Sequence, residues 1–290
     1  MIERRTILKG AAATAVVTMA QRSRRPLAQP AALMPVKSTF AAPVLTFAGL
    51  YIANKKGLWA KNGIGLDLEL VQGGALAMVS LTNQAADFTS TASTDPMIAW
   101  DRGIKTTIIA AFTGALAMQF TARKDWLERT GIGPRSPLAT KVKALTKARI
   151  GIPTVGGGPT QYAKYLAKMY GIDPDRDLKL FTVGFGPSRI AALRENQVDI
   201  TVGDAPEADE VMLGGFGELF INCAKEVPIY QDFPYTVALV TPETAKQKPD
   251  VVHRIGTTLA QANDFIHTNF GETVDIMKSQ FSKVDPRAIE

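Results

Sequence analysis

The sequence predicts an α/β fold in which helices cover both faces of a mostly parallel sheet. From residue 42 onward, short runs rich in β-branched and aromatic residues alternate with runs of helical spacing. Strands and helices that alternate in this way are typical of βαβ units. The 290 residues, 46% of them hydrophobic, suffice for one large or two medium-sized domains. No run of about 18 apolar residues is present, so the sequence predicts no transmembrane helix.

In the first half of the chain, each expected strand is followed by an expected helix. The expected strands are residues 43–49, 66–72, 86–91 and 105–112, and the expected helices are residues 50–63, 75–84 and 95–103. Residues 125–147 are rich in glycine, proline and basic side chains. We expect them to form a surface connection that ends in a short helix.

The alternation restarts after this connection, which predicts a second lobe. The expected strands are residues 148–153, 178–183, 198–202, 218–223 and 235–241, and the expected helices are residues 159–170, 187–196 and 206–213. In both halves a helix ends on Asn-Gln before a strand, at "LTNQAADF" and "LRENQVDI". Two similar lobes, or two turns that are alike by chance, would explain this echo. We expect one lobe at residues 37–127 plus 230–290 and the other at residues 128–229.

Residues 1–36 are expected to be a leader that carries an export signal. Arg4 and Arg5 precede the apolar run "AAATAVVTMA", an order typical of twin-arginine signals. The alternative is a basic amphipathic N-terminus on a cytoplasmic protein. The single cysteine, Cys223, lies far from this segment, so a lipid anchor is not expected. The sequence therefore predicts a free periplasmic protein.

The charge balance argues against a nucleic-acid partner. The whole chain has a formal net charge of +6, but residues 1–36 contain six basic and one acidic residue. The rest has 27 basic and 26 acidic residues and is nearly neutral, so the basic character lies largely in the leader. No His, Cys and acidic residues show metal-ligand spacing, and no cofactor is expected.

A glycine-rich loop between an expected strand and helix is the first candidate binding element. In "GIPTVGGGPTQYAKYLAKMYG", three glycines precede Pro159 and Thr160. Glycine lets backbone N–H groups approach a ligand, and a helix N-terminus favours an anionic or strongly polar group. No lysine follows the glycines, so this is not a nucleotide-binding P-loop. A turn without a ligand is the alternative. Tyr162, Tyr165, Leu166 and Met169 are expected to form the buried face of the helix.

Three further loops follow expected strands and have a similar polar character. They are "FAGLY" at residues 47–51, "TSTASTDP" at residues 89–96 and "VGDAPEAD" at residues 202–209. In open parallel sheets, ligands bind beyond the carboxyl ends of the strands. Two loops from each lobe can therefore face one cleft, although Ser and Thr clusters are also common helix caps.

From about residue 43 to the end, the chain resembles the substrate-binding proteins of ABC importers of the nitrate, sulfonate and taurine type, which include thiamine-precursor binders. The resemblance rests on the order and spacing of "LYIANKKGLWAKNGIGLDLELVQGG", "LTNQAADFTSTAST", the glycine-loop region and "IAALRENQVDITVGDAPEAD". Members of this family usually continue for some tens of residues beyond "VDPRAIE", so we expect that the sequence is truncated at Glu290.

The resemblance implies a type II periplasmic binding protein fold, with two α/β lobes, a ligand cleft between them and no enzymatic activity. It implies a monomer that delivers a sulfonate, taurine, nitrate or related organic acid to an ABC permease and its ATPase. A pyrimidine-type heterocycle is the alternative ligand. Carried over position by position, the expected ligand-binding residues are Tyr51, Ser90, Thr91, Ser93, Gly157, Gly158, Thr160 and Asp204.

An enzyme on the same fold is the rival hypothesis. A Cys/His nucleophile would require Cys223 to meet His253 or His267, and all three lie apart in the sequence. Asp204 and Glu207 could form an acid–base pair, because neighbouring carboxylates raise each other's pKa. Nothing but their spacing supports this reading, and the binding function is favoured.

Overall fold

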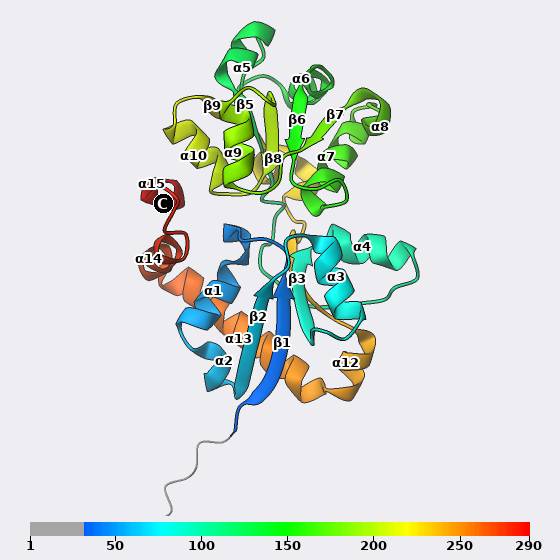
Figure 1. Cartoon of the computed structure of the whole chain (residues 1–290), viewed down its shortest axis with the longest axis vertical. Coiled ribbons are helices and arrows are strands. Elements are labelled where there is room, and N and C mark those ends of the chain that lie inside the picture. The colour runs from blue at the N-terminus through cyan, green and yellow to red at the C-terminus, as the bar shows by residue number, and fades with distance from the viewer. Residues whose placement is uncertain (1–31) are drawn as a thin grey trace, which may run out of the picture. The chain divides into compact units, whose positions relative to one another are not determined.

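The computed structural model describes residues 32–290, of which Met34–Glu290 form one compact unit. This unit contains two lobes, each built on a five-stranded sheet with helices packed around it (Figure 1). The first sheet has the order β2-β1-β3-β10-β4, with β1 Met34–Phe40, β2 Ile64–Leu70, β3 Phe88–Ala92, β4 Thr107–Ala111 and β10 Thr236–Val240. The second has the order β7-β6-β8-β5-β9, with β5 Gln119–Arg123, β6 Arg149–Ile152, β7 Lys179–Thr182, β8 Ile200–Gly203 and β9 Gly217–Asn222.

The two sheets share one topology. β1 runs parallel to β2 and β3, and β6 runs parallel to β7 and β8. The fourth strand of each sheet is antiparallel to both neighbours: β10 lies between β3 and β4, and β5 lies between β8 and β9. The chain crosses between the lobes at residues 112–118 and returns at residues 223–235. The echo between the two halves of the sequence therefore reflects two similarly built lobes.

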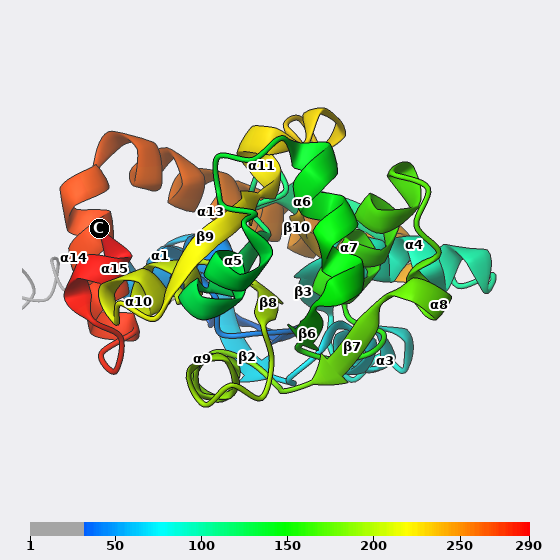
Figure 2. The ribbon, with the colours of Figure 1, turned by 90° about the horizontal axis from the view of Figure 1, so that it is seen from above.

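Helices surround both sheets (Figure 2). Those of the first lobe are α1 Ala48–Lys55, α2 Leu58–Lys61, α3 Gly74–Thr82, α4 Thr94–Asp101, α12 Pro242–Gln247, α13 Pro249–Thr268, α14 Phe270–Gln280 and α15 Pro286–Ile289, with the 3-10 turn Leu45–Phe47. Those of the second are α5 Lys124–Thr130, α6 Leu138–Ala144, α7 Gly158–Met169, α8 Pro174–Asp177, α9 Pro187–Arg194, α10 Glu207–Leu213 and α11 Cys223–Glu226, with 3-10 turns Leu145–Lys147 and Pro228–Tyr230. The C-terminal α15 packs beside α10 of the second lobe. Within residues 32–290, no helix is both long and apolar enough to cross a membrane.

Two expectations near the start of the folded unit are wrong. The predicted leader overlaps β1, because Met34–Phe40 forms a central strand of the first sheet. Most of the predicted signal lies in residues 1–31, outside the described residues. The expected strand at residues 43–49 is instead the turn Leu45–Phe47 and the start of α1. A short apolar run is ambiguous between strand and buried helix, and here tertiary packing selects the helix.

The position of the first crossing also differs from the expectation. β5 lies in the second sheet, so the lobe boundary falls before Gln119 rather than after residue 127. The connection expected at residues 125–147 does end in a short helix, α6, but the segment also begins with α5 and its α6 is partly buried. Lys141 of α6 is completely buried and donates hydrogen bonds to the carbonyl oxygens of Pro134 (3.0 Å) and Phe220 (2.9 Å), beside its ion pair with Glu226.

Each lobe has its own hydrophobic core. In the first, α13 covers the sheet and its Ile255 packs in one cluster with Phe47 and Phe88. In the second, α7 packs through Tyr162, Ala163, Leu166 and Ala167. Tyr165 and Met169, which were expected on this face, are 47% and 43% exposed. The small side chains of Ala163 and Ala167 bring this side of α7 against the sheet instead.

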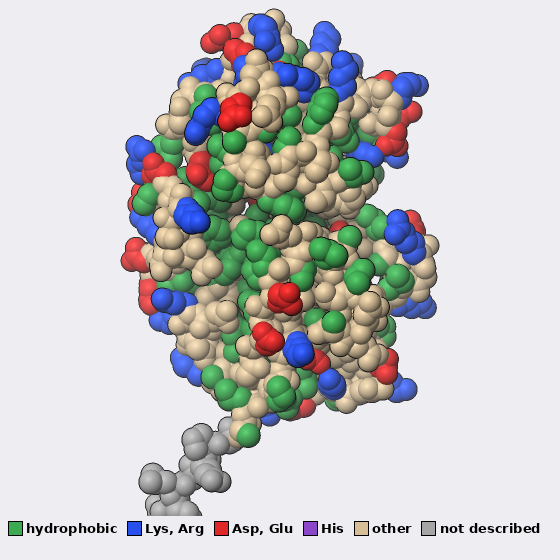
Figure 3. Space-filling view, in the orientation of Figure 1, with side chains coloured by type: hydrophobic (Ala, Val, Ile, Leu, Met, Phe, Trp, Pro, Cys, Tyr) green, Lys and Arg blue, Asp and Glu red, His purple; other side chains and the backbone are tan. Residues whose placement is uncertain are grey.

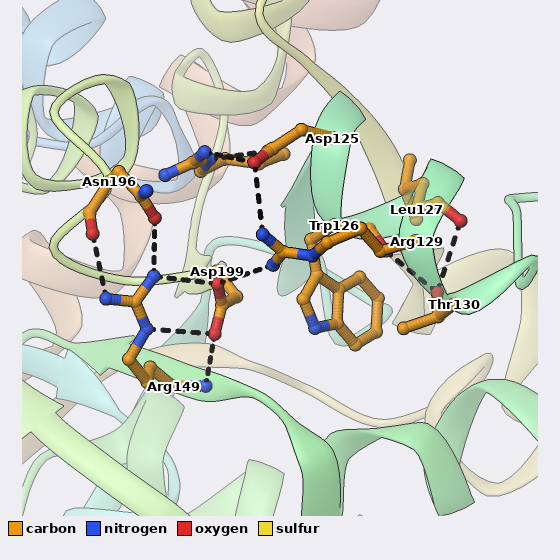
Figure 4. Close-up of polar contacts among 9 residues, drawn as sticks. Asp125, Trp126, Leu127, Arg129, Thr130, Arg149, Asn196 and Asp199 are labelled. Carbon is orange, nitrogen blue, oxygen red and sulfur yellow. Dashed lines mark hydrogen bonds and ion pairs between the residues drawn. The ribbon is translucent and has the colours of Figure 1, made fainter.

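An arginine–carboxylate network ties the start of β6 and helix α5 to Asp199, the residue before β8, at the outer end of the second lobe (Figure 4). Asp199 accepts hydrogen bonds from the backbone N–H of Arg149 (2.8 Å), its Nε (3.0 Å) and its Nη2 (2.8 Å). The guanidinium of Arg129 lies 3.6 Å from Asp199 and 3.5 Å from Asp125. Asp199 is 7% exposed, so its carboxylate depends on these partners in place of water.

We expect the substitution Asp199→Asn to lower the free energy of unfolding by about 2 kcal/mol at pH 7.5, because it removes the anion that compensates Arg149. Urea denaturation measures this loss. Asp175→Asn is the control, since Asp175 is 72% exposed in its pair with Lys164 and the substitution should leave the midpoint nearly unchanged.

The contribution of Asp199 to the free energy of unfolding should depend on pH. Burial raises the pKa of Asp199, but the hydrogen bonds and charge of Arg149 outweigh burial and lower it. The stabilisation is therefore fully present above the unfolded-state pKa of about 3.9 and is lost as the pH falls through the folded-state pKa. A difference between wild type and variant that persists undiminished at pH 2 would contradict this account.

Candidate ligand-binding site between the two lobes

A small pocket of about 40 Å³ lies where the strand ends of the two lobes meet. The first lobe contributes residues that follow β1 and β3, and the second contributes residues that follow β6 and β8. The return segment adds Tyr235 and Thr236 at the start of β10. The pocket thus lies at the carboxyl ends of the parallel strands, where open α/β sheets bind ligands. We call it the inner pocket.

A larger cavity of about 360 Å³ adjoins the inner pocket, and we call it the outer chamber. The two share Val44, Phe185 and Asp204 in their walls. Residues 280–284 at the end of α14 close one side of the outer chamber. Figure 3 shows hydrophobic side chains gathered along the junction between the lobes. The size of the chamber is within the range of small-molecule sites.

The glycine loop reaches the inner pocket through Gly157 and Gly158. A Cβ atom on Gly158 would lie 2.4 Å from the Cβ of Ala92, which belongs to the other lobe. A Cβ atom on Gly157 would lie 2.4 Å from Thr154 Oγ1 in its own loop. Glycine is therefore needed at position 158 because the loop touches the opposite lobe. Thr160 is fully buried but does not line the pocket, since its hydroxyl donates to the Thr154 carbonyl at 2.7 Å.

The candidate hydroxyls of the first lobe have different roles. Thr91 lines the inner pocket and donates a hydrogen bond to Asp95. Ser90 is fully buried beside the pocket without lining it, and its Oγ has no hydrogen-bond partner among the described residues. Ser93 connects the lobes instead: its Oγ lies 2.6 Å from the hydroxyl of Tyr162 and donates to the Pro234 carbonyl at 2.5 Å. Ser93 is therefore placed as an interlobe contact.

Tyr51 does not reach either cavity. Its ring packs edge-on against Phe40 and Phe281, with ring centroids 6.1 Å and 5.5 Å away, inside the core of the first lobe. Burial raises the pKa of its hydroxyl. The aromatic wall of the inner pocket is formed by Phe47, Phe185 and Tyr235. The ring at the start of α1 is thus a core residue.

Asp204 lines both cavities and is 7% exposed. Burial raises the pKa of its carboxyl to about 6, although a hydrogen bond from Tyr235 and the charge of Arg189 act in the opposite direction. Its Oδ1 has no hydrogen-bond partner among the described residues. Asp204 therefore offers a buried acceptor to whatever occupies the pocket.

Asp95 is a second buried carboxyl in the inner pocket, and sequence reasoning missed it. It lies one residue before Pro96 in the Ser/Thr-rich loop, where only the hydroxyls were considered. Its carboxylate lies against Gly74 at the start of α3, and a Cβ atom there would be 2.0 Å from Asp95 Oδ2. Burial raises the pKa of Asp95 to about 6, while hydrogen bonds from Thr91 and the Ala92 backbone lower it.

A buried arginine in the outer chamber was also missed, because it lies inside a predicted helix. Arg189 is 2% exposed, and its guanidinium pairs with Glu207 at 2.6 Å. Gly203 makes room for this pair, since a Cβ atom there would lie 2.6 Å from Arg189 Nη2. Glu207 is thus bound to Arg189 and is not a partner of Asp204 in acid–base chemistry.

Neither a thiolate nor a metal cluster is found at the site in the described part of the chain. Cys223 is fully buried, and burial raises the pKa of its thiol, so a thiolate nucleophile is not available. Among residues 32–290, no group of three His, Cys, Asp or Glu side chains could hold a metal ion. Both cavities are lined by buried hydrogen-bond acceptors, by aromatic side chains and by small residues that leave the backbone accessible.

The arrangement of lobes and cleft is that of periplasmic binding proteins. The structure superposes on the periplasmic nitrate-binding protein NrtA from Synechocystis PCC 6803 with a TM-score of 0.71 and 16% identity, over 88% of this chain and 69% of that one. It superposes on the periplasmic aliphatic sulphonate binding protein SsuA from Escherichia coli with a TM-score of 0.67 and 12% identity, over 88% and 81%. The predicted type II periplasmic binding protein fold is confirmed.

The chain belongs to the NMT1-like family, whose model matches residues 37–278. It is also 22% identical over 271 residues to YtlA of Bacillus subtilis (strain 168), which covers 89% of this chain and 74% of YtlA. The predicted membership in the group of binding proteins with this fold is therefore confirmed.

We expect the substitution Asp95→Asn to raise the free energy of unfolding by about 3 kcal/mol at pH 7.5. Because its folded-state pKa of about 6 lies above the model value of 3.8, the folded protein takes up the proton more readily. Wild-type stability should therefore fall as the pH rises from about 4 to about 6, and the variant should escape this loss.

Urea denaturation of both proteins at pH 4 and pH 7.5 measures the effect. Asp101→Asn is the matched control, since Asp101 lies on the same helix but is solvent-exposed. A variant less stable than wild type at pH 7.5 would show that the ionised carboxylate of Asp95 stabilises the fold.

Proposed function

We propose that this protein binds a small polar solute between its two lobes in the periplasm and delivers it to an ABC importer. The observation that carries the proposal is a buried pocket lined from both lobes, with an unpartnered acceptor of Asp204 in its wall. The family and the fold support it, because the structures superposed here are periplasmic binding proteins. The partner would be an ABC permease with its ATPase subunit.

The two lobes are suited to closing on a ligand. They are joined by the crossings at residues 112–118 and 223–235, and they touch directly at Gly158 and Ala92. A hinged pair of lobes can open to admit a solute and close around it. The Ser93–Tyr162 hydrogen bond, at 2.6 Å, would stabilise the closed arrangement.

The ligand classes considered for this chain are sulfonates, taurine, nitrate and related organic acids. The N-terminus of α7 supports an acidic group, because no side chain caps it and Gly157 and Gly158 expose its backbone to the pocket. Among the solved structures, SsuA is named for aliphatic sulphonates and NrtA for nitrate. A heterocycle of the pyrimidine type is the second candidate, since buried carboxyls such as Asp204 accept hydrogen bonds from ring amino groups.

A binding function accounts for the site better than an enzymatic one. The two buried carboxyls lie in a pocket without a nucleophile or a metal-binding cluster among the described residues. Cys223 is shielded, and Glu207 is engaged with Arg189. Recovery of a bound solute unchanged after incubation would support binding, whereas turnover would support an enzyme.

We expect a true ligand to stabilise the folded protein in a thermal-shift screen. A solute at about 100 times its dissociation constant adds about 2.7 kcal/mol, which corresponds to a shift of about 5 °C for a chain of this size. The screen should contain nitrate, taurine, alkanesulfonates, aromatic acids and pyrimidines. Equal melting temperatures with every compound and with a broad solute mixture would refute a solute-binding function.

We expect the substitution Gly158→Val to hold the lobes apart, because its side chain would collide with Ala92 across the cleft. The variant should show a larger radius of gyration in X-ray scattering and a ligand affinity reduced about tenfold or more. Gly156→Val is the matched control, since a Cβ atom at Gly156 meets nothing within 4 Å. An unchanged radius and affinity in Gly158→Val would show that closure does not depend on this contact.

A further inference from the structure

The inner pocket has an acidic lining that lacks a compensating base. Asp95 comes from the first lobe and Asp204 from the second, and they are the charged residues that line it in the described part of the chain. Both are more than nine-tenths buried, at 6% and 7% exposure. Two carboxylates held out of water in one small space favour a positive charge between them.

The groups that could neutralise these carboxylates from within the protein are engaged or distant. The buried guanidinium of Arg189 faces the outer chamber and is paired with Glu207 at 2.6 Å, although its Nη1 has no partner among the described residues. Its charge lowers the pKa of Asp204, but burial outweighs this effect and the pKa remains raised. Asp95 receives a hydrogen bond from Thr91, which carries no charge. The positive partner of the pocket is therefore missing from the described lining.

Unused polar atoms in the same lining point to a ligand. Oδ1 of Asp204 has no hydrogen-bond partner, and neither has Oγ1 of Thr46, which is 7% exposed. Both residues line the inner pocket. Buried polar atoms are rarely left unsatisfied in folded proteins. Oδ1 of the ionised Asp204 therefore requires a hydrogen-bond donor, whereas the hydroxyl of Thr46 can donate or accept.

The N-terminus of α7 acts in the opposite sense and favours a negative group. A helix terminus contributes about 30-fold to binding at most, whereas a buried charge pair contributes from about 30-fold to several thousand-fold. The starts of α3 and α4 also favour the charge of Asp95, which lies against Gly74 and in the first turn of α4. These helix termini offset the burial of the two carboxylates only in part, because the pKa values of both remain raised. A ligand that carries only a negative charge, such as nitrate or an unsubstituted alkanesulfonate, would meet net repulsion in the inner pocket.

We propose that the solute presents a positively charged nitrogen, of the ammonium or amidinium type, to Asp204 and Asp95 in the inner pocket. This inference rests on the proposed function and specifies its ligand class. A zwitterion fits equally well, with its acidic group toward the α7 N-terminus. The nitrogen donates hydrogen bonds to Asp204 Oδ1, and its positive charge compensates the negative charge of the two carboxylates.

The outer chamber indicates the remainder of the solute. Its volume of about 360 Å³ adjoins the inner pocket at Asp204, and its walls include the apolar side chains of Pro43, Val44, Phe185 and Phe281. The inner pocket, at about 40 Å³, accommodates little more than the charged group. The solute class is therefore an organic amine with an apolar or mixed body rather than a small inorganic ion.

The test uses the purified protein at pH 7.5, where both carboxyls, with pKa values of about 6, are ionised. Yeast extract serves as a mixture of small solutes and is separated on a strong cation exchanger at pH 2.5. The exchanger retains amines and amino carboxylic acids, whereas aminosulfonates pass through because their sulfonate stays ionised, so taurine is tested as a pure probe. The melting temperature of the protein is measured with the retained and the unretained fraction. Taurine and isethionate, and benzylamine and benzyl alcohol, are matched pure probes that differ in the nitrogen.

Four variants accompany the wild type. Asp204→Asn and Asp95→Asn remove the charge at nearly constant volume, and Asp209→Asn and Asp101→Asn remove a carboxylate outside both cavities on α10 and α4. We expect the retained fraction to stabilise the wild type and both control variants. Asp204→Asn should require about a 30-fold higher concentration of the retained fraction for the same rise in melting temperature. Asp95→Asn should also require a higher concentration than the wild type.

Stabilisation by the unretained fraction without stabilisation by taurine, or by the retained fraction equally in wild type and Asp204→Asn, would overturn the inference and leave the proposed function intact. Stabilisation by neither fraction and by no probe would refute the proposed function together with the inference. An amine probe that stabilises the wild type at least tenfold better than its oxygen analogue, and loses that advantage in Asp204→Asn, would identify the nitrogen as the recognised group.

Discussion

The close contact of two backbones across the cleft is the constraint on which this structure depends. Gly158, at the first turn of α7, lies against Ala92 at the end of β3, and no side chain larger than hydrogen fits between them. Ala92 in turn packs into the hydrophobic cluster of the second lobe. The Ser93–Tyr162 hydrogen bond lies beside this contact. The inner pocket exists because the lobes meet here while the neighbouring loops remain apart.

The topology explains how two separately built lobes share one site. Each sheet takes its fourth, antiparallel strand directly from a crossing of the chain: β5 enters the second lobe and β10 returns to the first. Each crossing therefore leaves an edge strand of one sheet, β4 or β9, and enters an interior strand of the other, β5 or β10. The pocket-lining residues Tyr235 and Thr236 lie at the end of the return crossing, where a change in lobe orientation would reach the ligand directly.

Buried charges are treated differently on the two sides of Asp204. Arg189 and Glu207 form a pair with room prepared by Gly203, so burial of that guanidinium is compensated within the protein. Asp204 and Asp95 lack an equivalent partner, and their carboxyls have raised pKa values as a consequence of burial. The Arg189–Glu207 pair destabilises the ligand-free protein little, because each charge compensates the other. A carboxylate without a partner destabilises the ligand-free protein, and a ligand that neutralises it gains this free energy on binding. This contrast separates residues that hold the site from residues that recognise a solute.

The sequence by itself determined the α/β alternation, the two-lobe plan and the glycine loop, because hydrophobic period and turn residues are local signals. It located Gly157, Gly158, Thr91 and Asp204, all of which line the inner pocket. Only the tertiary structure decided that the hydroxyls of Ser93 and Thr160 donate to backbone carbonyls of the protein. It also placed Tyr51 in a hydrophobic core, and it buried Asp95 and Arg189 beside the ligand cavities. The physical reason is that hydrogen-bond partners and burial depend on segments far apart in the chain, such as Ser93 and Pro234. A local sequence pattern contains no information about such partners.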